Sequence, residues 1–487
     1  MPQGSRGHIG IKKETTWGEK VVGVNDFFLP FLSETLTTKP EELLSATQRG
    51  VLDEPKSYQG EFAFDGDVVI EVHPTSIGHI LRSALGAPAA AVAAGSVETE
   101  VCDCETIWEH ADTVIPSLDS NIKKKGSYSS KLQVSAAAAA GVLASREITF
   151  DFSDPAVTHY KFWLRCDIAL SAADLAFVIS EQALGAEGAS FDLVNIPAMA
   201  VPGQWYEHTI AVSDISDMET AISVAIKMLV DKGEFTLWIE DIRAVVAGEA
   251  ASAKQHIFTP MQLAAEEFHA DCPLFPYTFE VYKDQGDAFQ FLGGVINSLA
   301  LNFSTTDKIL KATCGVIAKN IGSVAATALS LEATKPFVWE NAIIKIGGSQ
   351  NNNLESFGLT WNNNCIAKYF LNYSNIPGKI IRNGYRTIPV NFVIDFTDRT
   401  EYDYFMAGTE RAFQIQFIGA VCEAGPPAFY YTLTIDLPLV RYLAFPIPIS
   451  GPGRLTCAVT GKAKYDAAGW ALRATLINLK DTAEYAA

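Results

Sequence analysis

The stretch Arg386–Gly408, with the sequence RTIPVNFVIDFTDRTEYDYFMAG, combines a strand, a turn and a short helix. Ile388–Phe396 alternates between apolar and polar residues, which is the pattern of a β-strand with one buried face. A polar turn, Thr397–Thr400, separates this strand from a short helical segment, Tyr402–Met406. Gly408 predicts the end of the helix, because glycine adopts the left-handed cap conformation at little cost. This stretch therefore predicts a β-rich fold with short helices.

The same succession occurs earlier in the chain. Gly66–Val72 alternates, Pro74–Ser76 begins a helix, and Gly86 ends it. The match is one of pattern and not of residue identity, so two unrelated α+β segments would produce it as well. A true duplication would allow a ring to be built from half as many subunits. Two alternating runs follow each helix: Tyr277–Val281 and Lys308–Thr313 after the first, and Tyr431–Ile435 and Arg454–Val459 after the second.

The bulk composition is that of an ordinary folded protein, with 48% apolar and 19% charged residues in a chain of 487. This length predicts about three domains. The polar start, Met1–Glu14, is not typical of a signal peptide, and the longest run of small apolar residues, Ala136–Leu143, is far shorter than the ~20 residues of a membrane span. The cysteines are scattered except for Cys102-x-Cys104, which is too close for a zinc knuckle and has no second pair. We therefore expect no membrane insertion, and idle thiols in a reducing compartment.

The net charge of −19 is unevenly distributed along the chain. Residues 97–250 contain 24 Asp and Glu against 10 Lys and Arg, whereas the rest contains 32 and 27. Binding to nucleic-acid phosphates requires clustered basic residues. The one basic run, Lys123–Lys125, lies inside the acidic segment before Gly126 and is best interpreted as a solvated turn. The charge distribution argues against a nucleic-acid-binding protein.

Two linkers rich in small residues, Leu85–Ser96 and Val245–Lys254, enclose the acidic segment. Paired linkers of this kind are typical of an inserted domain, because insertion is tolerated where the two connections lie close together. By comparison with the second module, the insert would occupy the connection that Thr409–Phe429 forms there. The predicted domains are 1–95 for the first part of the first module, 97–250 for the insert, 255–335 for the completion of the first module, and 336–487 for the second module.

The insert contains short alternating runs with turn signals between them, which predicts a β-sandwich or jelly roll. It resembles the jelly-roll carbohydrate-binding modules in Cys104-Glu105 with Trp108, in Gly126–Ser129, in Phe162–Arg165, in Trp205 and in Ile239–Ile242. The alternating runs are Ser129–Val134, Glu147–Phe152, Tyr160–Arg165, Leu175–Ile179, Trp205–Ile210 and Phe235–Glu240.

Two kinds of ligand follow from this resemblance. Many such modules carry a structural calcium ion near their first and last strands, which implies Glu105 and Asp241 as candidate ligands. Calcium needs six to eight oxygen ligands, and two carboxylates alone do not specify a site. Trp163, Trp205 and Trp238 are candidate sugar platforms, but each lies in an apolar strand run, which favours a position in the core.

No pattern of catalytic residues emerges from the sequence. It contains no His-Glu-x-x-His, no glycine-rich phosphate loop with Lys-Ser/Thr, no Gly-x-Ser-x-Gly and no Cys-x-x-Cys. Glu266, Glu267 and His269 are candidate metal ligands, but no matching third ligand follows and an exposed helix face is the simpler interpretation. Glu105 and Glu109 are a candidate glycosidase pair, yet carboxylates so close in sequence are common. We therefore expect no enzymatic activity and no catalytic, cofactor-binding or metal site beyond the calcium considered above.

A further set of segments lies outside the insert: Gly10–Gly18, Phe31–Leu36, Arg49-Gly50, Gly60, Gly66–Val68, Pro74–Gly86, Gln255–Phe258, Phe275–Val281, Gly293–Leu301, Trp361–Asn364, Leu437-Pro438 and Thr475–Asn478. Together they resemble the phage tail tube proteins, the major tail proteins of long-tailed, non-contractile phages. Gly293–Leu301 is the most specific piece. The sequence departs from the family at the large insert and at the Asn-rich turn Gln350–Asn353.

The resemblance implies a structural virion protein that polymerises into stacked rings and so forms the tail tube through which phage DNA is delivered. Open strand edges of one subunit would pair with those of the next until a closed barrel leaves no edge. Strands such as Val295–Leu301 and Phe392–Phe396 suit this role, since their residues alternate between a packed face and a lumen or outer face. With two modules per chain, we expect a homotrimeric ring with pseudo-sixfold symmetry, carrying the insert on the outside.

The predicted fold is thus mainly β: a duplicated sandwich or barrel of the tail tube type with short helices, plus an inserted jelly roll. The expected partners are further copies of the chain, other tail proteins (tape measure, terminator and baseplate), and DNA that passes the lumen without specific binding. We expect the protein in the virion after assembly in the host cytoplasm. The insert could also adhere weakly to cell-surface glycans, with avidity from many copies. Two alternatives stay open: a glycan-binding protein, and another phage tail ring protein of the terminator or baseplate.

Overall fold

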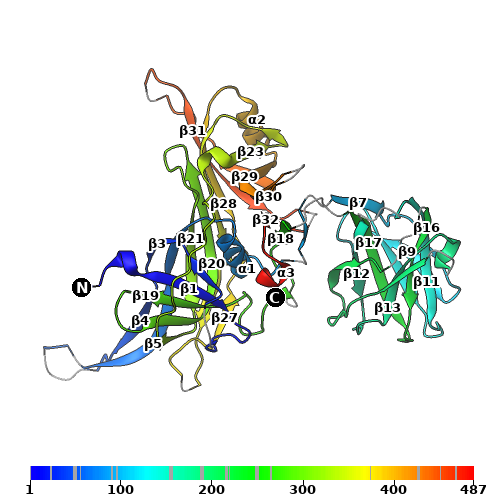
Figure 1. Cartoon of the computed structure of the whole chain (residues 1–487), viewed down its shortest axis with the longest axis horizontal. Coiled ribbons are helices and arrows are strands. Elements are labelled where there is room, and N and C mark those ends of the chain that lie inside the picture. The colour runs from blue at the N-terminus through cyan, green and yellow to red at the C-terminus, as the bar shows by residue number, and fades with distance from the viewer. Residues whose placement is uncertain are drawn as a thin grey trace. The chain divides into compact units, whose positions relative to one another are not determined.

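The chain forms two compact units in the computed structural model (Figure 1). Unit 1 comprises residues 1–91, 256–466 and 470–487, and unit 2 comprises residues 92–255 with 467–469. Unit 2 contains the predicted insert, whereas parts of both predicted linkers, and Arg49-Gly50, lie outside the described residues. The structure describes residues 2–21, 25–47, 52–54, 56–88, 91–94, 97–152, 157–186, 191–213, 218, 220–246, 252–263, 266–372, 374–424, 428–449, 451–466 and 469–486.

Unit 1 contains one set of elements twice, in the same order along the chain. The first module has β1 (His8–Lys13), β2 (Phe27–Leu29), β3 (Phe31–Glu34), β4 (Thr37–Leu44), β5 (Ser57–Glu71), α1 (Ser76–Ala84), β19 (Tyr277–Tyr282), β20 (Ala288–Ser304), β21 (Lys311–Ala318) and β22 (Asn320–Val324). The second has β23 (Ala342–Ile346), β24 (Ser349–Gln350), β25 (Leu354–Asn362), β26 (Cys365–Lys368), β27 (Lys379–Arg382), β28 (Pro389–Asp395), α2 (Thr400–Ala407), β29 (Arg411–Glu423), β30 (Phe429–Ala444), β31 (Thr456–Lys464) and β32 (Arg473–Asn478). Helix α3 (Thr482–Tyr485) follows.

The strand pairing of the two modules is the same. In the first module the start of β20 lies between β19 and β22, and its end pairs with β21, which pairs with β5. In the second module the start of β30 lies between β29 and β32, and its end pairs with β31, which pairs with β28. β1 flanks β19 as β23 flanks β29. The duplicated, mainly β fold predicted from the sequence is confirmed. The strands of both modules, except β26 and β27, belong to one 19-stranded sheet, and the described residues of one chain form no closed barrel.

The repeat extends to the register of individual residues. Gly66 and Val390 occupy equivalent positions, since each pairs with the corresponding residue of β21 or β31. The same number of residues separates Gly66 from the start of α1 at Ser76 and Val390 from the start of α2 at Thr400. β20 and β30 each carry a β-bulge, at Asn297 and Leu443, and β3 and β25 each carry one as well. Bulges are retained features of a fold. Their coincidence favours a duplication over two unrelated α+β segments.

One part of the sequence-based alignment is wrong. Thr409–Phe429 is not a connection, because it contains strand β29. The strand at Tyr277, β19, is therefore the counterpart of β29, and β20 is the counterpart of the strand at Tyr431, β30. The insert lies between α1 and β19, where the second module has only the short turn between α2 and β29. The run at Lys308 enters β21 only from Lys311, and Ile309 before it forms an isolated bridge.

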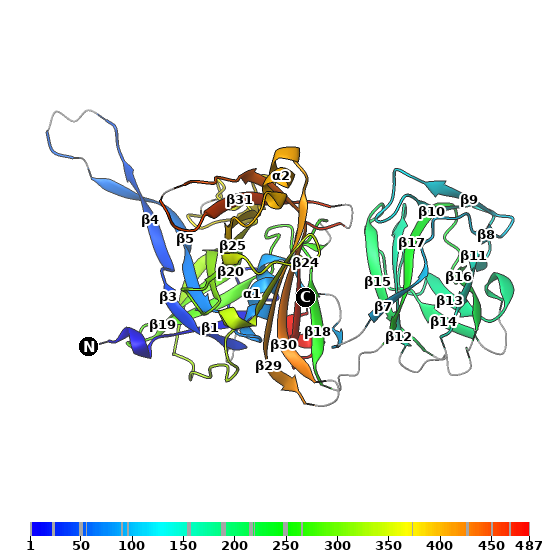
Figure 2. The same cartoon turned by 90° about the horizontal axis from the view of Figure 1, so that it is seen from above.

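The β4–β5 hairpin extends beyond the sheet of the first module. Its pairing continues to Leu44 and Ser57. Figure 2 shows the hairpin standing away from the rest of unit 1. The described part of the chain contains no helix that is both long and apolar enough to cross a membrane.

Unit 2 is a sandwich of two sheets around its own apolar core, in agreement with the predicted jelly roll. One sheet has the order β15-β12-β17-β10-β9 with β7 paired to β17, and the other has the order β14-β13-β16-β11-β8. Short strands β6 (Val92–Ala93) and β18 (Lys254–Phe258) pair where the chain enters and leaves the unit. The sandwich strands are β7 (Val97–Cys102), β8 (Glu109–His110), β9 (Val114–Asp119), β10 (Ser129–Val134), β11 (Gly141–Phe150), β12 (Val157–Cys166), β13 (Leu175–Ser180), β14 (Phe191–Asn195), β15 (Trp205–Ala211), β16 (Ala221–Met228) and β17 (Phe235–Val246).

Candidate assembly surface

One continuous run of strands crosses both modules of unit 1. β4, β5, β21 and the end of β20 come from the first module, and β25, β28, β31 and the end of β30 from the second. The modules are joined inside this run by β20 and β25, where Leu301 pairs with Leu359 and Phe303 with Phe357. Among the described residues, β4 pairs only with β5, and the end of β30 pairs only with β31. The run therefore has an open edge at each side.

The two faces of this run differ in chemistry. β21 and β31 alternate strictly between buried residues and more exposed ones. Val68, Phe392 and Val459 lie in the apolar core on the inner face. Directly paired residues share a face, so the strand register shows which side chains form the outer face. These side chains are small and polar. One row across it is Thr460, Asn391, Gly358, Asn302, Lys311 and Glu71.

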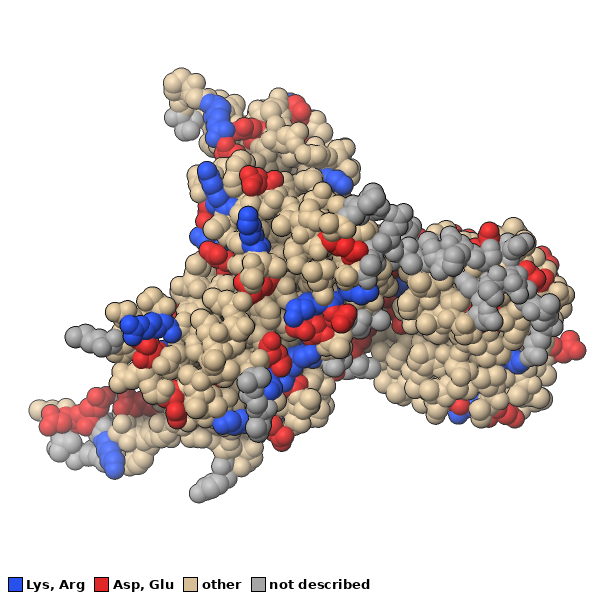
Figure 3. Space-filling view, viewed as in Figure 1, with Lys and Arg blue, Asp and Glu red and all other residues tan. Residues whose placement is uncertain are grey.

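The outer face is smooth and has little net charge. A side chain at Gly358 would collide with Asn391 Oδ1 at 2.0 Å and with Asn302 Oδ1 at 2.8 Å, so these two amides lie over the glycine. Lys311 lies opposite Glu71 on the neighbouring strand, and its ammonium forms an ion pair with Asp307 at 2.8 Å. Figure 3 shows acidic and basic side chains interspersed over the visible face of unit 1, with several acidic side chains and a basic one beside them on the described part of the β4–β5 hairpin. Such a face offers a phosphate backbone no cluster of cations.

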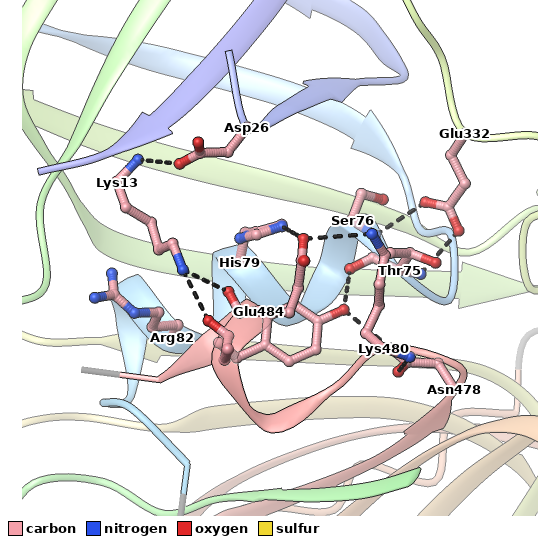
Figure 4. Close-up of polar contacts among 12 residues, drawn as sticks. Lys13, Asp26, Thr75, Ser76, His79, Arg82, Glu332, Asn478, Lys480 and Glu484 are labelled. Atoms are coloured by element: carbon pink, nitrogen blue, oxygen red, sulfur yellow. Dashed lines mark hydrogen bonds and ion pairs between the residues drawn. The ribbon is translucent and has the colours of Figure 1, made fainter. Parts of the chain in front are cut away.

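Helix α1 of the first module is held by the C-terminal segment of the chain (Figure 4). Tyr485 is fully buried, and its hydroxyl donates to the Thr75 carbonyl oxygen at 2.7 Å. Lys13 Nζ donates to the carbonyl oxygens of residues 483 and 484, each at 3.0 Å. The Glu332 carboxylate accepts the amides of Thr75 and Ser76 at the start of the helix. All nine residues of α1 are buried.

A buried imidazole lies at the centre of these contacts. Burial lowers the pKa of His79, so the ring is neutral. Its Nε2 donates to Glu484 Oε1 at 3.1 Å, and its Nδ1 accepts from the Tyr277 hydroxyl at 3.3 Å. The hydrogen bond from His79 lowers the pKa of Glu484 to about 2. The group fastens the end of the chain to α1, and it offers no open site for a substrate.

Helix α2 of the second module buries none of its residues. Glu401 at its start accepts hydrogen bonds from Arg411 Nη2 at 3.0 Å and from the Tyr442 hydroxyl at 2.7 Å. Met406 is 65% exposed. The helix ends at Gly408 in the left-handed conformation, as the sequence predicts.

A duplicated β-module with two open sheet edges and one polar face suits a subunit that polymerises. The model of one family, described as phage tail tube protein, matches residues 4–463. The chain belongs to the phage tail tube protein family. A search of the curated proteins finds no match. The tail tube protein is therefore a structural component of the phage tail, as the sequence resemblance implied.

Solved carbohydrate-binding modules are similar in fold to the insert of this tail tube protein. The family 11 module of the cellulosomal cellulase Lic26A-Cel5E of Clostridium thermocellum is 12% identical, covers 32% of this chain and 98% of its own length, and has a TM-score of 0.23. The CBM22-1 xylan-binding domain of Paenibacillus barcinonensis Xyn10C is 14% identical, with 33% and 99% covered and a TM-score of 0.22. A likeness of this degree concerns fold alone.

The candidate tryptophans of the insert are placed differently from the prediction. Trp205 and Trp238 are buried, as expected, but neither belongs to the apolar core of the sandwich. Phe162 and Leu164 on β12 are core residues, so Trp163 between them faces the opposite side of the sheet and is half-buried. The alternation of β12 contained this signal, because neighbouring residues in a strand point to opposite faces.

Cations lie over two of these rings, Trp163 and Trp238, on the outer face of the sheet. Arg165 pairs with both Trp205 and Trp238 on the adjacent strands, and its guanidinium lies 5.4 Å from the Trp238 ring centroid. The Lys124 amine lies 4.5 Å from the centroid of Trp163. Cation–π contacts of this kind stabilise a sheet surface. A sugar could stack on Trp163 or Trp238 only after these cations move.

The candidate calcium ligands are bonded to protein groups. Asp241 pairs with Lys125 and, at 2.8 Å, with Arg243 Nε. Glu105 accepts the amide of Ser127. The Lys125 ammonium thus supplies positive charge beside a carboxylate that the resemblance assigned to calcium. Within the described ranges, no group of three or more His, Cys, Asp and Glu side chains is placed to hold a metal ion.

The other candidate sites are not assembled. The segment of Glu266, Glu267 and His269 is not the helix that the sequence suggested, because His269 forms an isolated bridge with Cys272. Glu267 pairs with Arg382 at 3.1 Å, while Glu266 accepts backbone amides within its own turn.

Glu105 and Glu109, the candidate glycosidase pair, do not face each other. Glu109 is exposed on β8, whereas Glu105 faces the Ser127 loop. All eight cysteines are free, and Cys422 is the one that is not buried.

Proposed function

We propose that three copies of the chain close a ring with pseudo-sixfold symmetry, that rings stack into the tail tube, and that phage DNA passes through its lumen. The observation that supports this most is the junction of β20 and β25 within one chain. Because the two modules repeat, the end of β30 in the second module is equivalent to the end of β20 in the first. Likewise, β3 with the start of β4 in the first module is equivalent to β25 in the second. The same junction can therefore form between copies.

The repeat also gives the register of the proposed junction. Within the chain, Ser298 pairs with Asn362 and Leu301 with Leu359. The equivalent pairing places Ala444 opposite Lys39 of the next copy. Three residues farther along, Ile447 comes opposite the next copy's Leu36, which extends β30 beyond its present end. Obligate interfaces of this kind bury more than ~2,000 Å².

The sequence after β30 suits pairing on one side only. Pro446 and Pro448 lack a backbone donor, and residues two apart in a strand point their N–H groups to the same side. Phe445, Ile447 and Ile449 keep their donors on the other side. A strand with prolines on one side and backbone donors on the other can pair with one neighbouring strand and not with a second.

Electron microscopy of the assembled protein tests the proposal. We expect rings of three chains with six similar lobes around the lumen, and Ile447→Pro should abolish them by removing a donor from the open side. Ile447→Ala is the matched control, because it shortens the same side chain and keeps the N–H group. Rings of six chains would contradict the pseudo-sixfold arrangement, and a chain that stays monomeric at high concentration would contradict tube formation.

The lumen would be lined by the outer face of the strand run. Its small polar residues and its balanced Lys311 and Glu71 suit the passage of DNA without binding, because tight phosphate contacts would slow the passage. The insert would then decorate the outside of the tube. Contacts with the tape measure, terminator and baseplate proteins, and assembly in the host cytoplasm, follow from the same proposal.

A second function for the insert is weak binding of cell-surface glycans. The half-buried Trp163 on the outer face of β12 favours it, since aromatic rings stack on sugars and many copies would add avidity. A glycan array with the full chain tests it: binding that disappears in Trp163→Ala but persists in Trp108→Phe, a change inside the core, would support a glycan site. No binding by the wild type would leave the insert as decoration.

A further inference from the structure

Two hairpins occupy the same place in the two modules. In the second module, β25 leads into the hairpin β26–β27, which precedes β28. In the first module, β3 leads into the hairpin β4–β5. The two hairpins differ in their surroundings, and this difference identifies a docking surface.

The β26–β27 hairpin lies against the first module. The Cys365 amide donates to Asn297 Oδ1 at 2.8 Å, at the bulge of β20. Cys365 and Ile380 share one apolar cluster with Val295, and Ile317 packs against this cluster. The flank of the first module, formed by the end of β20 and by β21, is thus covered by a hairpin of the neighbouring module.

The β4–β5 hairpin has no such support at its tip. Leu43 and Tyr58 are 46% and 55% exposed. Glu41 and Glu42 beside them are exposed as well. Figure 3 shows acidic side chains on this hairpin. A hairpin that presents apolar and acidic side chains together is typical of an interaction surface.

The corresponding flank of the second module is uncovered. Leu443 at the bulge of β30 is 53% exposed. The side chains of Arg441 and Lys462 beside it have no ion pair among the described residues. By strand register, the positions of Val295, Asn297 and Ile317 in the first module are taken in the second by Arg441, Leu443 and Lys462.

We propose that the β4–β5 hairpin of one copy docks on this flank of the next copy, as β26–β27 docks on the first module within the chain. This rests on the ring assembly proposed above. By strand register, Lys39 of the first module is equivalent to Asn362 of the second. Three residues later in each module, Glu42 is therefore equivalent to Cys365. Glu42 then meets Arg441 and Lys462 of the next copy, so an ion pair between copies replaces the apolar contact within the chain.

A charge exchange tests the docking. Glu42→Arg alone, or Arg441→Glu with Lys462→Glu, should raise the protein concentration needed for half-assembly more than about tenfold, because like charges then face each other. All three substitutions in one chain should restore assembly to near the wild-type concentration, since each hairpin meets the flank of another copy. Lys345→Glu on β23, away from this flank, is the control for a change of net charge.

Sedimentation and electron microscopy give the assembled fraction, and circular dichroism checks that each variant is folded. Unchanged assembly of folded single-charge variants would overturn the docking and leave the tube function standing. Failure of the triple variant to recover would overturn it as well. A wild-type chain that forms no rings at all would instead overturn the tube function, and the docking with it.

Discussion

The two modules of unit 1 share a fold but differ in how well their helices are covered. Helix α1 buries all nine of its residues, whereas α2 buries none. The end of α1 receives hydrogen bonds from Trp361 and Asn363 of the second module, both to the Ala84 carbonyl oxygen, and its outer side is covered by Tyr485. Among the described residues, α2 receives no comparable cover. Unequal burial of equal elements is what we expect if a further copy covers α2 in the proposed ring.

The largest expected effect concerns the residue that covers α1. Tyr485→Ala should lower the free energy of unfolding of unit 1 by about 3–5 kcal/mol, because it opens a cavity beside Gly78 and removes the hydrogen bond to Thr75. Tyr402→Ala on the half-buried face of α2 should lower it by about 1 kcal/mol or less in the isolated chain. Urea denaturation of both variants measures the difference. Equal losses would show that the two helices do not differ in the stability they contribute.

The second expected effect is a sensitivity to acid that belongs to the first module. The folded state holds His79 neutral, with its pKa lowered by burial, so below about pH 6.5 the unfolded chain binds a proton that the folded chain resists. Stability is then present above this pH and decreases as the pH falls. Glu484, with its pKa near 2, adds a loss of the same sign below about pH 4.5.

Urea denaturation of unit 1 at two pH values measures this effect. Between pH 7 and pH 5 the free energy of unfolding should fall by about 1–2 kcal/mol, and by less in His79→Gln. His256, another buried histidine of unit 1 with a lowered pKa, contributes in the same direction and accounts for the part that remains. An identical pH dependence in the wild type and in His79→Gln would contradict the assignment to α1.

The local elements of the fold were predictable from the sequence, because alternation and end signals are local. The strand at Ile388–Phe396, the helix that ends at Gly408, and five of the six alternating runs of the insert appear where the patterns place them. The run Glu147–Phe152 coincides only with the end of β11, and β7, β8, β9, β14 and β16 had no run of their own. The correspondence of strands between the modules was not predictable, since it depends on pairing between distant segments. Val421 and Glu423, beyond the regular alternation of β29, pair with β30 only across bulges, and the pattern alone gave that segment the role of a connection.

The assembly surface was only partly predictable. The sequence indicated strands with a packed and an open face, such as Val295–Leu301, and the structure places that strand at the junction of the modules. Contacts at the start of α1 come from Glu332 and Tyr485, and Lys13 holds the C-terminal segment that carries Tyr485; no local pattern connects these residues with the helix. The flank of Arg441 and Lys462 could be identified only by comparing the strand register of the second module with that of the first.

The smallest expected effect concerns how the two helices end. α1 continues through Ala84 in the helical conformation, and the carbonyl oxygen of this last residue accepts hydrogen bonds from both Trp361 and Asn363. α2 has no such partner in the part of the chain that the structure describes, and it ends at Gly408, with φ +71°, a conformation that costs an alanine about 1 kcal/mol. Gly408→Ala should therefore destabilise unit 1 by about 1 kcal/mol or slightly more, since the new methyl group also displaces the Arg441 guanidinium, 2.4 Å from its position. Gly348→Ala, at φ +85° with open space around it, provides the backbone cost alone in urea denaturation. If both variants lose the same stability, Arg441 moves freely, and its side chain is available to the hairpin of the next copy without cost to α2.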